Sequence, residues 1–136
     1  MSRATVIYIH IITNRDKVNR CLALQNGNRG FGYLADKLLV ICGDLRTVLG
    51  AQEYFDLNTN IGIFLMNLSY ALYYKKIGHC ILNWYALPDV DKKLRQIISI
   101  PEEENIAAFI VCGVVPENFN IAVSPRFEVE HFYTVE

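Results

Sequence analysis

The hydrophobic positions of the chain are densest between Leu57 and Ile77. Within Ile61–Ile77, apolar or aromatic side chains occupy twelve of seventeen positions and lie nearly all round a helical cylinder. A helix with this pattern is either the centre of a core or a membrane span. Four polar residues interrupt the run, namely Asn58, Asn60, Asn67 and Ser69. Because the run is also short for a bilayer, we expect a buried core helix, with a membrane span over 57–77 as the alternative.

The residues after this helix predict a helix end that is followed at once by a strand. Two lysines fall in the last turn, where positive charge suits the helix dipole. Gly78 is then the natural residue to end the helix. The next segment, HCILNW, is expected to form a short strand that ends at Asn83 and Trp84.

Three further segments predict buried strands. They are Thr5–Ile12 (TVIYIHII), Lys37–Cys42 (KLLVIC) and Asn105–Val115 (NIAAFIVCGVV). The first is β-branched and aromatic without clean alternation, which is typical of a strand covered on both faces. His10 lies inside it, and we expect a hydrogen-bonded histidine rather than a metal ligand, because no partner is near in the sequence.

Two shorter helices are predicted between the strands. The stretch Thr13–Asp16 resembles a capping box and predicts a helix over residues 15–24. A second helix is expected to start near Pro88 and to end at Pro101. Its apolar face is formed by Val90, Leu94, Ile97 and Ile98.

Four stretches predict irregular or surface structure. Residues 45–56 are expected to form a loop with a helical turn. The glycine-rich stretch 26–30 reads as a surface loop, since its spacing does not fit a phosphate-binding motif. The three consecutive carboxylates at 102–104 are expected in a solvated turn. The tail 120–136 is too apolar for a disordered end, so we expect it to pack on the body or on another subunit.

Length and composition place the chain among single-domain proteins with an apolar surplus. At 136 residues, without internal repeats or a linker, residues 1–136 are expected to form one domain. The order β-α-β-α-β-α-β supports an α/β or α+β architecture. An apolar content of 52% with 20% charged residues favours an oligomer interface. The net charge of −1, without a basic patch, indicates no nucleic-acid partner.

The cysteines and the start of the chain indicate a cytoplasmic protein. The four cysteines, Cys21, Cys42, Cys80 and Cys112, form no CxxC pair. Free thiols in a reducing cytosol are therefore expected rather than a disulfide framework. The apolar start lacks a small-residue cleavage site and is followed directly by charged residues, so it predicts a strand rather than a signal peptide.

The sequence contains no recognisable catalytic motif. The sequence offers no defensible Ser-His-Asp set, nucleophile elbow or metal-ligand cluster, so no catalytic residue is assigned and no metal is expected. His79 and Cys80 are neighbours in the sequence and could suggest a thiol–imidazole pair. We expect their side chains not to meet, because adjacent residues of a strand point to opposite faces.

From about Ala35 to Arg126, about two-thirds of the chain, the sequence resembles the C-terminal half of nitroreductase-family flavoproteins. The matching pieces are ADKLLVICGD, NIGIFLMNLSYALYYKKIG, HCILNW, LPDVDKKLRQIISIPEEENIAAFIVCGVVPE and SPR. In that family a strand follows an Ala-Asp pair, and a long buried helix leads into a Cys-containing strand. Next come a leucine-rich helix that ends near Ile-Pro, a strand that runs into Gly, and a basic residue near the C-terminus. The combination of order and spacing carries the resemblance.

The resemblance implies an α+β fold with a central, mostly antiparallel sheet, flanking helices and one long buried central helix. It implies a homodimer with FMN in a groove at the interface, reduced by NAD(P)H. The acceptors implied are nitroaromatics, quinones or similar small molecules. By position, Asn83 and Trp84 fall where the family passes the flavin ring, and Arg126 falls where it has a basic residue on the FMN phosphate. Trp84 as a core or interface aromatic and Arg126 as a surface charge are the alternatives.

The chain departs from the family pattern at its N-terminal end. The family normally begins with a helical region that carries an Arg-Arg-Ser-like phosphate motif and a later Asn-x-Gln-Pro-Trp-like segment. This sequence has neither, so we expect a truncated nitroreductase-like domain, with Arg3 near the join. Two functions follow: an FMN-dependent oxidoreductase, or a catalytically inactive dimer that acts as a flavin-binding or interaction module. The sequence leaves open whether the loop at 25–33 replaces the lost phosphate contacts.

Overall fold

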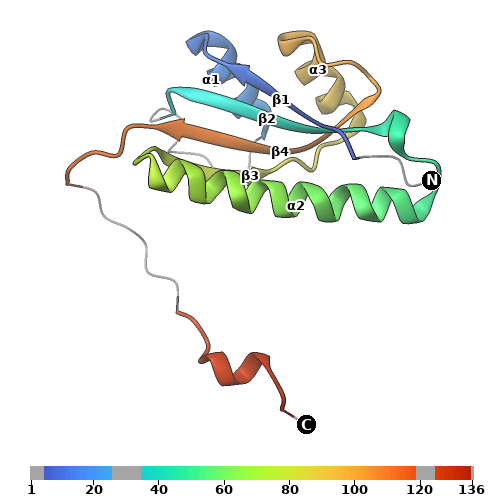
Figure 1. The fold of residues 1–136 in the computed structure, drawn as a ribbon. Coiled ribbons are helices and arrows are strands. Elements are labelled where there is room, and N and C mark those ends of the chain that lie inside the picture. Colours follow the sequence, from blue (N-terminus) through green and yellow to red (C-terminus); the bar gives the residue numbers. More distant parts are fainter. Residues whose placement is uncertain (1–4, 26–34, 119–124, 136) are drawn as a thin grey trace.

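The computed structural model describes residues 5–25, 35–118 and 125–135. Strands and helices alternate along these segments (Figure 1). In chain order they are β1 (Ile7–Ile12), α1 (Arg15–Gln25), β2 (Lys37–Asp44), α2 (Ala51–Tyr74), β3 (Gly78–Asn83), α3 (Pro88–Ile98) and β4 (Glu104–Gly113). Two short 3-10 turns lie at Leu45–Thr47 and Val129–Phe132. The loop expected at 26–30 and the residue Arg3 lie outside the described residues.

The strands form one antiparallel sheet in the order β1-β2-β4-β3. The two central strands, β2 and β4, pair from Lys37 opposite Cys112 to Asp44 opposite Glu104. The register shifts by one residue between Ile41 and Cys42. β1 and β3 are the edge strands. The expected α+β class with a central antiparallel sheet is therefore confirmed.

Helices cover both faces of the sheet, with α1 and α3 on one face and α2 along the other (Figure 1). Successive residues of a strand point to opposite faces, so each central strand contributes to two separate cores. The core under α1 and α3 includes Val18, Cys21, Leu38, Val40, Leu94 and Phe109. The core under α2 consists of Ile41, Leu57, Ile61, Ile110 and Cys112.

The long helix α2 begins at Ala51, so the loop expected over residues 45–56 is wrong from that point onward. Polar side chains near its start satisfy their own hydrogen bonds within the helix. The Asn58 amide donates to the Tyr54 carbonyl at 2.8 Å, and the Thr59 hydroxyl donates to the Phe55 carbonyl at 3.0 Å. Asn58, one of the four polar residues that interrupt the apolar run, is therefore compatible with a helix of 24 residues.

The expected end of α2 at Gly78 is also wrong. Lys76 takes the left-handed conformation after the helix, with φ of 57°, and Gly78 is already the first residue of β3. Glycine is required at 78 for a different reason. A Cβ atom there would clash with the Val115 side chain and lie 3.0 Å from the Gly113 carbonyl oxygen.

Within one chain, α2 is buried on one side and not all round. Leu57 and Ile61 are buried against the sheet, with four partly buried neighbours, Phe64, Leu65, Leu68 and Leu72. The opposite side carries six exposed apolar residues, which we call the outer face of α2: Phe55, Ile63, Met66, Tyr70, Tyr73 and Tyr74. A helix lying on a single sheet face has only one side to bury. In the described part of the chain, no helix has both the length and the apolar character needed to cross a bilayer.

The first strand and the two shorter helices differ from expectation in detail. β1 is covered on one face, and Ile11 on the other is 62% exposed, because the buried core under α2 is built on β2 and β4 and not on β1. The cap of α1 is Asn14, whose Oδ1 accepts the Lys17 backbone N–H at 3.0 Å, one residue later than the expected capping box. α3 starts at Pro88 as expected and ends at Ile98, before Pro101.

Truncation of Leu57 is expected to destabilise the fold strongly. Its side chain is 1% exposed and packs between α2 and the sheet. Leu57→Ala should lower the free energy of unfolding by about 2–5 kcal/mol, as for other buried leucines. The control Leu49→Ala, at a residue 72% exposed, should change it by less than about 0.5 kcal/mol. Urea unfolding measures both, and equal effects would contradict this account of the core.

Candidate functional site

The C-terminal end of β3 holds two of the three residues that the resemblance places near a flavin. Asn83 is the last residue of this edge strand and pairs with Ala108 of β4. Its carbonyl oxygen accepts a hydrogen bond from Gln25 Nε2 at 3.1 Å, which ties the end of α1 to the strand. The Asn83 residue is exposed, so its carboxamide faces solvent.

Trp84 faces the interior of the fold. Its ring stacks on Phe109 with centroids 4.8 Å apart and planes inclined by 22°. The indole Nε1 donates to Asp91 Oδ1 at 2.9 Å, and Asp91 also accepts from Arg95 Nε at 2.6 Å. Arg95 in turn donates to the Glu104 carbonyl at 2.9 Å. Trp84 therefore fastens the end of β3 to α3 and, through Arg95, to the start of β4.

Arg126 does not meet the other two residues within one chain. It belongs to the segment 125–135, in which every described residue is exposed. This segment lies away from the sheet and from α2 (Figure 1). Among the contacts of the described residues, no hydrogen bond or ion pair joins Arg126 to Asn83 or Trp84. A single chain therefore brings together Asn83 and Trp84 and leaves Arg126 apart.

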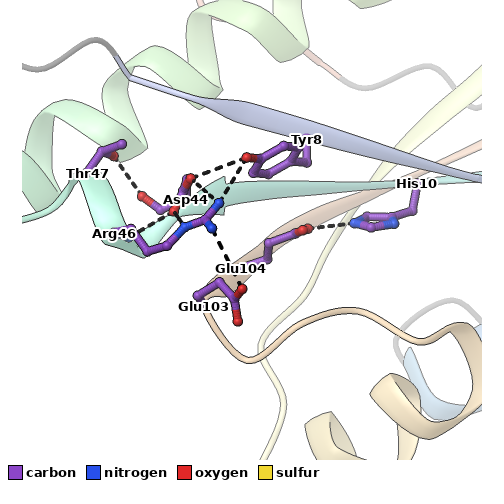
Figure 2. A network of polar contacts seen from close by, with 7 residues as sticks. All are labelled: Tyr8, His10, Asp44, Arg46, Thr47, Glu103 and Glu104. Atoms are coloured by element: carbon purple, nitrogen blue, oxygen red, sulfur yellow. Dashed lines mark hydrogen bonds and ion pairs between the residues drawn. The ribbon is translucent and has the colours of Figure 1, made fainter.

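A polar network at the end of β2 was not predicted from the sequence (Figure 2). Asp44 is buried, and Arg46 binds it with two donors, Nε to Oδ1 at 2.9 Å and Nη2 to Oδ2 at 2.8 Å. Tyr8 of β1 accepts from Arg46 at 3.1 Å, and Thr47 donates to the Asp44 carbonyl at 2.7 Å. The Glu103 Oε1 atom lies 3.9 Å from Arg46 Nη1. The Arg46 guanidinium holds the pKa of Asp44 down at about 2.

The network is adjacent to a second pair, His10 and Glu104 (Figure 2). The two side chains lie 2.6 Å apart, Nε2 to Oε2, which confirms the expected hydrogen-bonded histidine. Glu102 and Glu103 are exposed as expected, but Glu104 is buried, so the solvated turn is wrong at its last residue. Glu104 is buried because it is the first residue of β4 and points toward the same face as His10.

His79 and Cys80 do not act together, as expected for neighbours on a strand. The His79 Nδ1 lies 3.0 Å from the Ile77 carbonyl, which can only accept, so Nδ1 carries the proton. Nε2 then accepts from the Ser69 hydroxyl of α2 at 2.5 Å. Cys80 instead contacts the Ile81 carbonyl. The Ser69–His79 contact links α2 to β3. His79 and Cys80 form no nucleophile–base pair, since their side chains have different partners.

The four cysteines are free, as expected, and three of them are buried. Burial raises the pKa of the Cys21 thiol to about 11. Burial, with the Glu104 carboxylate nearby, raises the pKa of Cys42 to about 12. Both therefore stay protonated thiols near neutral pH, which does not suit a catalytic nucleophile.

Comparisons with known proteins identify the fold. No protein-family profile matches the sequence, and no curated protein matches it. Among solved structures, the NfrA1 nitroreductase from B. subtilis has a TM-score of 0.75 and 17% identity, over 94% of this chain and 56% of that chain. The NADPH:FMN oxidoreductase from Vibrio harveyi, in complex with NAD+, has a TM-score of 0.71 and 19% identity, over 92% of this chain and 56% of that chain.

A third structure agrees. The FMN-dependent nitroreductase from Clostridium difficile has a TM-score of 0.67 and 14% identity, over 86% of this chain and 68% of that chain. The chain has the nitroreductase fold. Across eight such structures, it spans 53% to 74% of the length of the matched chain. At these identities the likeness concerns the fold alone.

Acid is expected to weaken the fold through Asp44. Its pKa of about 2 in the folded state lies below the value of about 3.9 for an unfolded aspartate. The stabilisation is therefore complete above about pH 4 and is lost as the pH falls toward 2. Asp44→Asn should be less stable than the wild type at pH 7, and it should lose less unfolding free energy between these pH values.

Urea unfolding at a series of pH values measures this difference. Asp56→Asn is the matched control, because it removes an exposed carboxylate of α2 outside the network. The control is expected to keep the pH dependence of the wild type. An Asp44→Asn protein with that same pH dependence would rule out the role assigned to Asp44.

Proposed function

We propose that the chain is an FMN-dependent oxidoreductase of the nitroreductase type. In this proposal NAD(P)H is the electron donor, and a nitroaromatic, quinone or similar small molecule is the acceptor. One observation carries it: more than nine-tenths of the chain matches the fold of structures named as a nitroreductase and an NADPH:FMN oxidoreductase. The sequence resemblance between Ala35 and Arg126 supports the same class. Bound FMN would supply the redox chemistry, and the protein would bind and orient it.

The exposed groups fit FMN in their chemistry. The Asn83 carboxamide can both donate and accept, which suits the polar edge of a flavin ring. The exposed Arg126 guanidinium suits a phosphate, whose oxygens it can bind with two parallel hydrogen bonds. The indole of Trp84 is already engaged by Phe109 and Asp91. Trp84 would therefore serve the flavin site through its main chain and by holding Asn83 in place.

The proposed flavin site includes groups from two copies of the chain. The outer face of α2 supports a homodimer, because six large apolar side chains are exposed along one helix. The segment 125–135 adds Phe127, Val129, Phe132 and Tyr133, all exposed. Burying these surfaces between two subunits would also allow Arg126 of one chain to serve the site of the other.

A second candidate is a catalytically inactive dimer of the same fold, acting as a flavin-binding or interaction module. It is favoured by the position of Arg126 in an exposed segment away from the sheet, because a single chain then does not assemble all of the proposed flavin contacts. This candidate keeps the dimer and predicts no turnover of NAD(P)H.

We also propose a cytoplasmic location. All four cysteines are free, and no two of them form a disulfide. Free thiols are the rule in a reducing cytosol, whereas oxidising compartments favour disulfides.

The protein is expected to keep a flavin absorption spectrum after incubation with FMN and desalting. The flavin-loaded protein should then oxidise NADH or NADPH in the presence of a quinone or a nitroaromatic. Arg126→Ala should weaken FMN binding by about 1.5–3 kcal/mol, the scale of a hydrogen bond to a charged group. Arg20→Ala, at an exposed arginine of α1, should leave it unchanged.

These measurements separate the two candidates. Flavin that is retained without NAD(P)H oxidation would favour the inactive module. A colourless protein after desalting would contradict the FMN proposal as a whole. Wild-type affinity in Arg126→Ala would remove Arg126 from the site and leave the rest of the proposal standing.

The homodimer is expected to depend on the outer face of α2. Met66 lies in the middle of that face and is 54% exposed in the single chain. Met66→Glu would place a charge in the proposed interface and should shift the mass measured by light scattering from dimer to monomer. Leu87→Glu is the control, since Leu87 is 69% exposed at the start of α3, on the other side of the sheet. A monomeric wild type, or a dimeric Met66→Glu, would contradict the interface.

A further inference from the structure

Three potential metal ligands from three different strands meet on the sheet face that carries α1 and α3. His10 of β1, Cys42 of β2 and Glu104 of β4 each offer one donor atom, and these atoms lie within 4.8 Å of one another. The register explains the meeting. Cys42 lies opposite Tyr8 on β1, two residues from His10, and opposite Ile106 on β4, two residues from Glu104. Residues two apart on a strand share a face.

We propose that His10, Cys42 and Glu104 form a binding site for a divalent transition-metal ion, best suited to Zn²⁺. The donor set is one imidazole nitrogen, one sulfur and one carboxylate oxygen. Zn²⁺ accepts all three, whereas Ca²⁺ and Mg²⁺ prefer oxygen ligands alone. Three protein ligands would leave a fourth tetrahedral position for water.

The geometry requires only small side-chain movements. With Zn–ligand bonds of about 2.0–2.3 Å, the ligand atoms of a tetrahedral site lie about 3–4 Å apart. His10 and Glu104 are at 2.6 Å in their direct hydrogen bond, so the ion would separate them slightly and draw Cys42 inward. The backbone positions come from paired strands, which hold ligands more precisely than loops do.

The local charge favours a cation at this position. Glu104 is buried, and among the ion pairs of the described residues its partner is His10. The guanidinium of Arg95 is bound to Asp91 and donates to the main-chain oxygen of Glu104 rather than to its carboxylate. A buried carboxylate requires compensating positive charge. Zn²⁺ would displace the proton of the Cys42 thiol on binding, and the ion with one thiolate and one carboxylate would make a neutral site.

The neighbours of the cluster hold it in place and leave an entrance. The end of β2 is held beside the start of β4, since the Leu45 N–H donates to the Glu103 carbonyl at 2.8 Å and Arg46, bound to Asp44, pairs with the Glu103 carboxylate (Figure 2). The side chain of His10 is 26% exposed, so one ligand can be reached from solvent. Cys42 is fully buried, which protects its sulfur from oxidation.

Cobalt is the probe that tests the site, because Co²⁺ replaces Zn²⁺ and its bond to a thiolate absorbs in the near ultraviolet. The full chain, free of FMN, is expected to bind one equivalent of Co²⁺ with this band, and Zn²⁺ should displace it. Cys42→Ser should abolish the band. His10→Gln should weaken Co²⁺ binding by more than about tenfold. Loss of a residue that only supports a metal ligand already costs about 10–100-fold in affinity, so loss of a ligand should cost at least as much.

Cys80→Ser is the matched control, since Cys80 is the exposed cysteine and lies outside the cluster. It is expected to keep the band. Circular dichroism checks that each variant is folded, and His10→Gln, at a partly exposed residue, decides the matter if Cys42→Ser unfolds. If the wild type shows no band at saturating Co²⁺, the metal site is ruled out, and His10 and Glu104 form only a hydrogen bond. A band that survives Cys42→Ser, or wild-type affinity in a folded His10→Gln, would equally overturn the proposal.

Discussion

The pairing of β2 with β4 is the constraint on which the rest of the structure depends. These two strands are buried on both faces along most of their length. Each must therefore present apolar side chains to two different helical layers. This leaves little room for polar chemistry in the middle of the sheet. Polar groups collect instead on the edge strands and at the strand ends, where Asp44 and Glu104 face each other across the register.

The end of β3 and the start of β4 are connected by one series of polar contacts. It runs from Trp84 to Asp91, from Asp91 to Arg95, and from Arg95 to the main chain of Glu104. The proposed flavin contact at Asn83 and the proposed metal site at Glu104 therefore share a common support in α3. A substitution of Asp91 or Arg95 would therefore affect both the proposed flavin contact and the proposed metal site, although neither side chain belongs to either site.

Much of the fold was predictable, because the strands are β-branched runs and α3 has a clear apolar stripe. The burial of Leu94 and Ile98 on one side of α3 follows directly from helical periodicity. The start of α2 was missed because the dense apolar run begins only at Leu57 and residues 45–56 were taken for a loop with a helical turn. The outer face of α2 was taken for core, since hydrophobicity alone does not say what covers a side chain.

The candidate sites were less predictable than the fold. Asn83, Trp84 and Arg126 came from a family resemblance and not from their own pattern. The inward orientation of Trp84 depends on Phe109, which lies 25 positions further along the chain. His10 and Glu104 are 94 positions apart, and Tyr8 and Asp44 are 36 apart. Only the pairing of the strands brings such residues together, so no local spacing could have indicated them.

The strand order also divides the sheet into two similar halves. β1-α1-β2 and β3-α3-β4 are each two antiparallel strands with a helix between them, and both helices lie on the same face. Within each half the nearest paired residues are about 25 positions apart, whereas β2 and β4 come no closer than 60 positions. Closing the longer loop costs more chain entropy and slows folding. The β2–β4 pairing, which joins the two halves of the sheet, is thus the one with the largest separation in sequence. The segment that contains α2 connects the two halves.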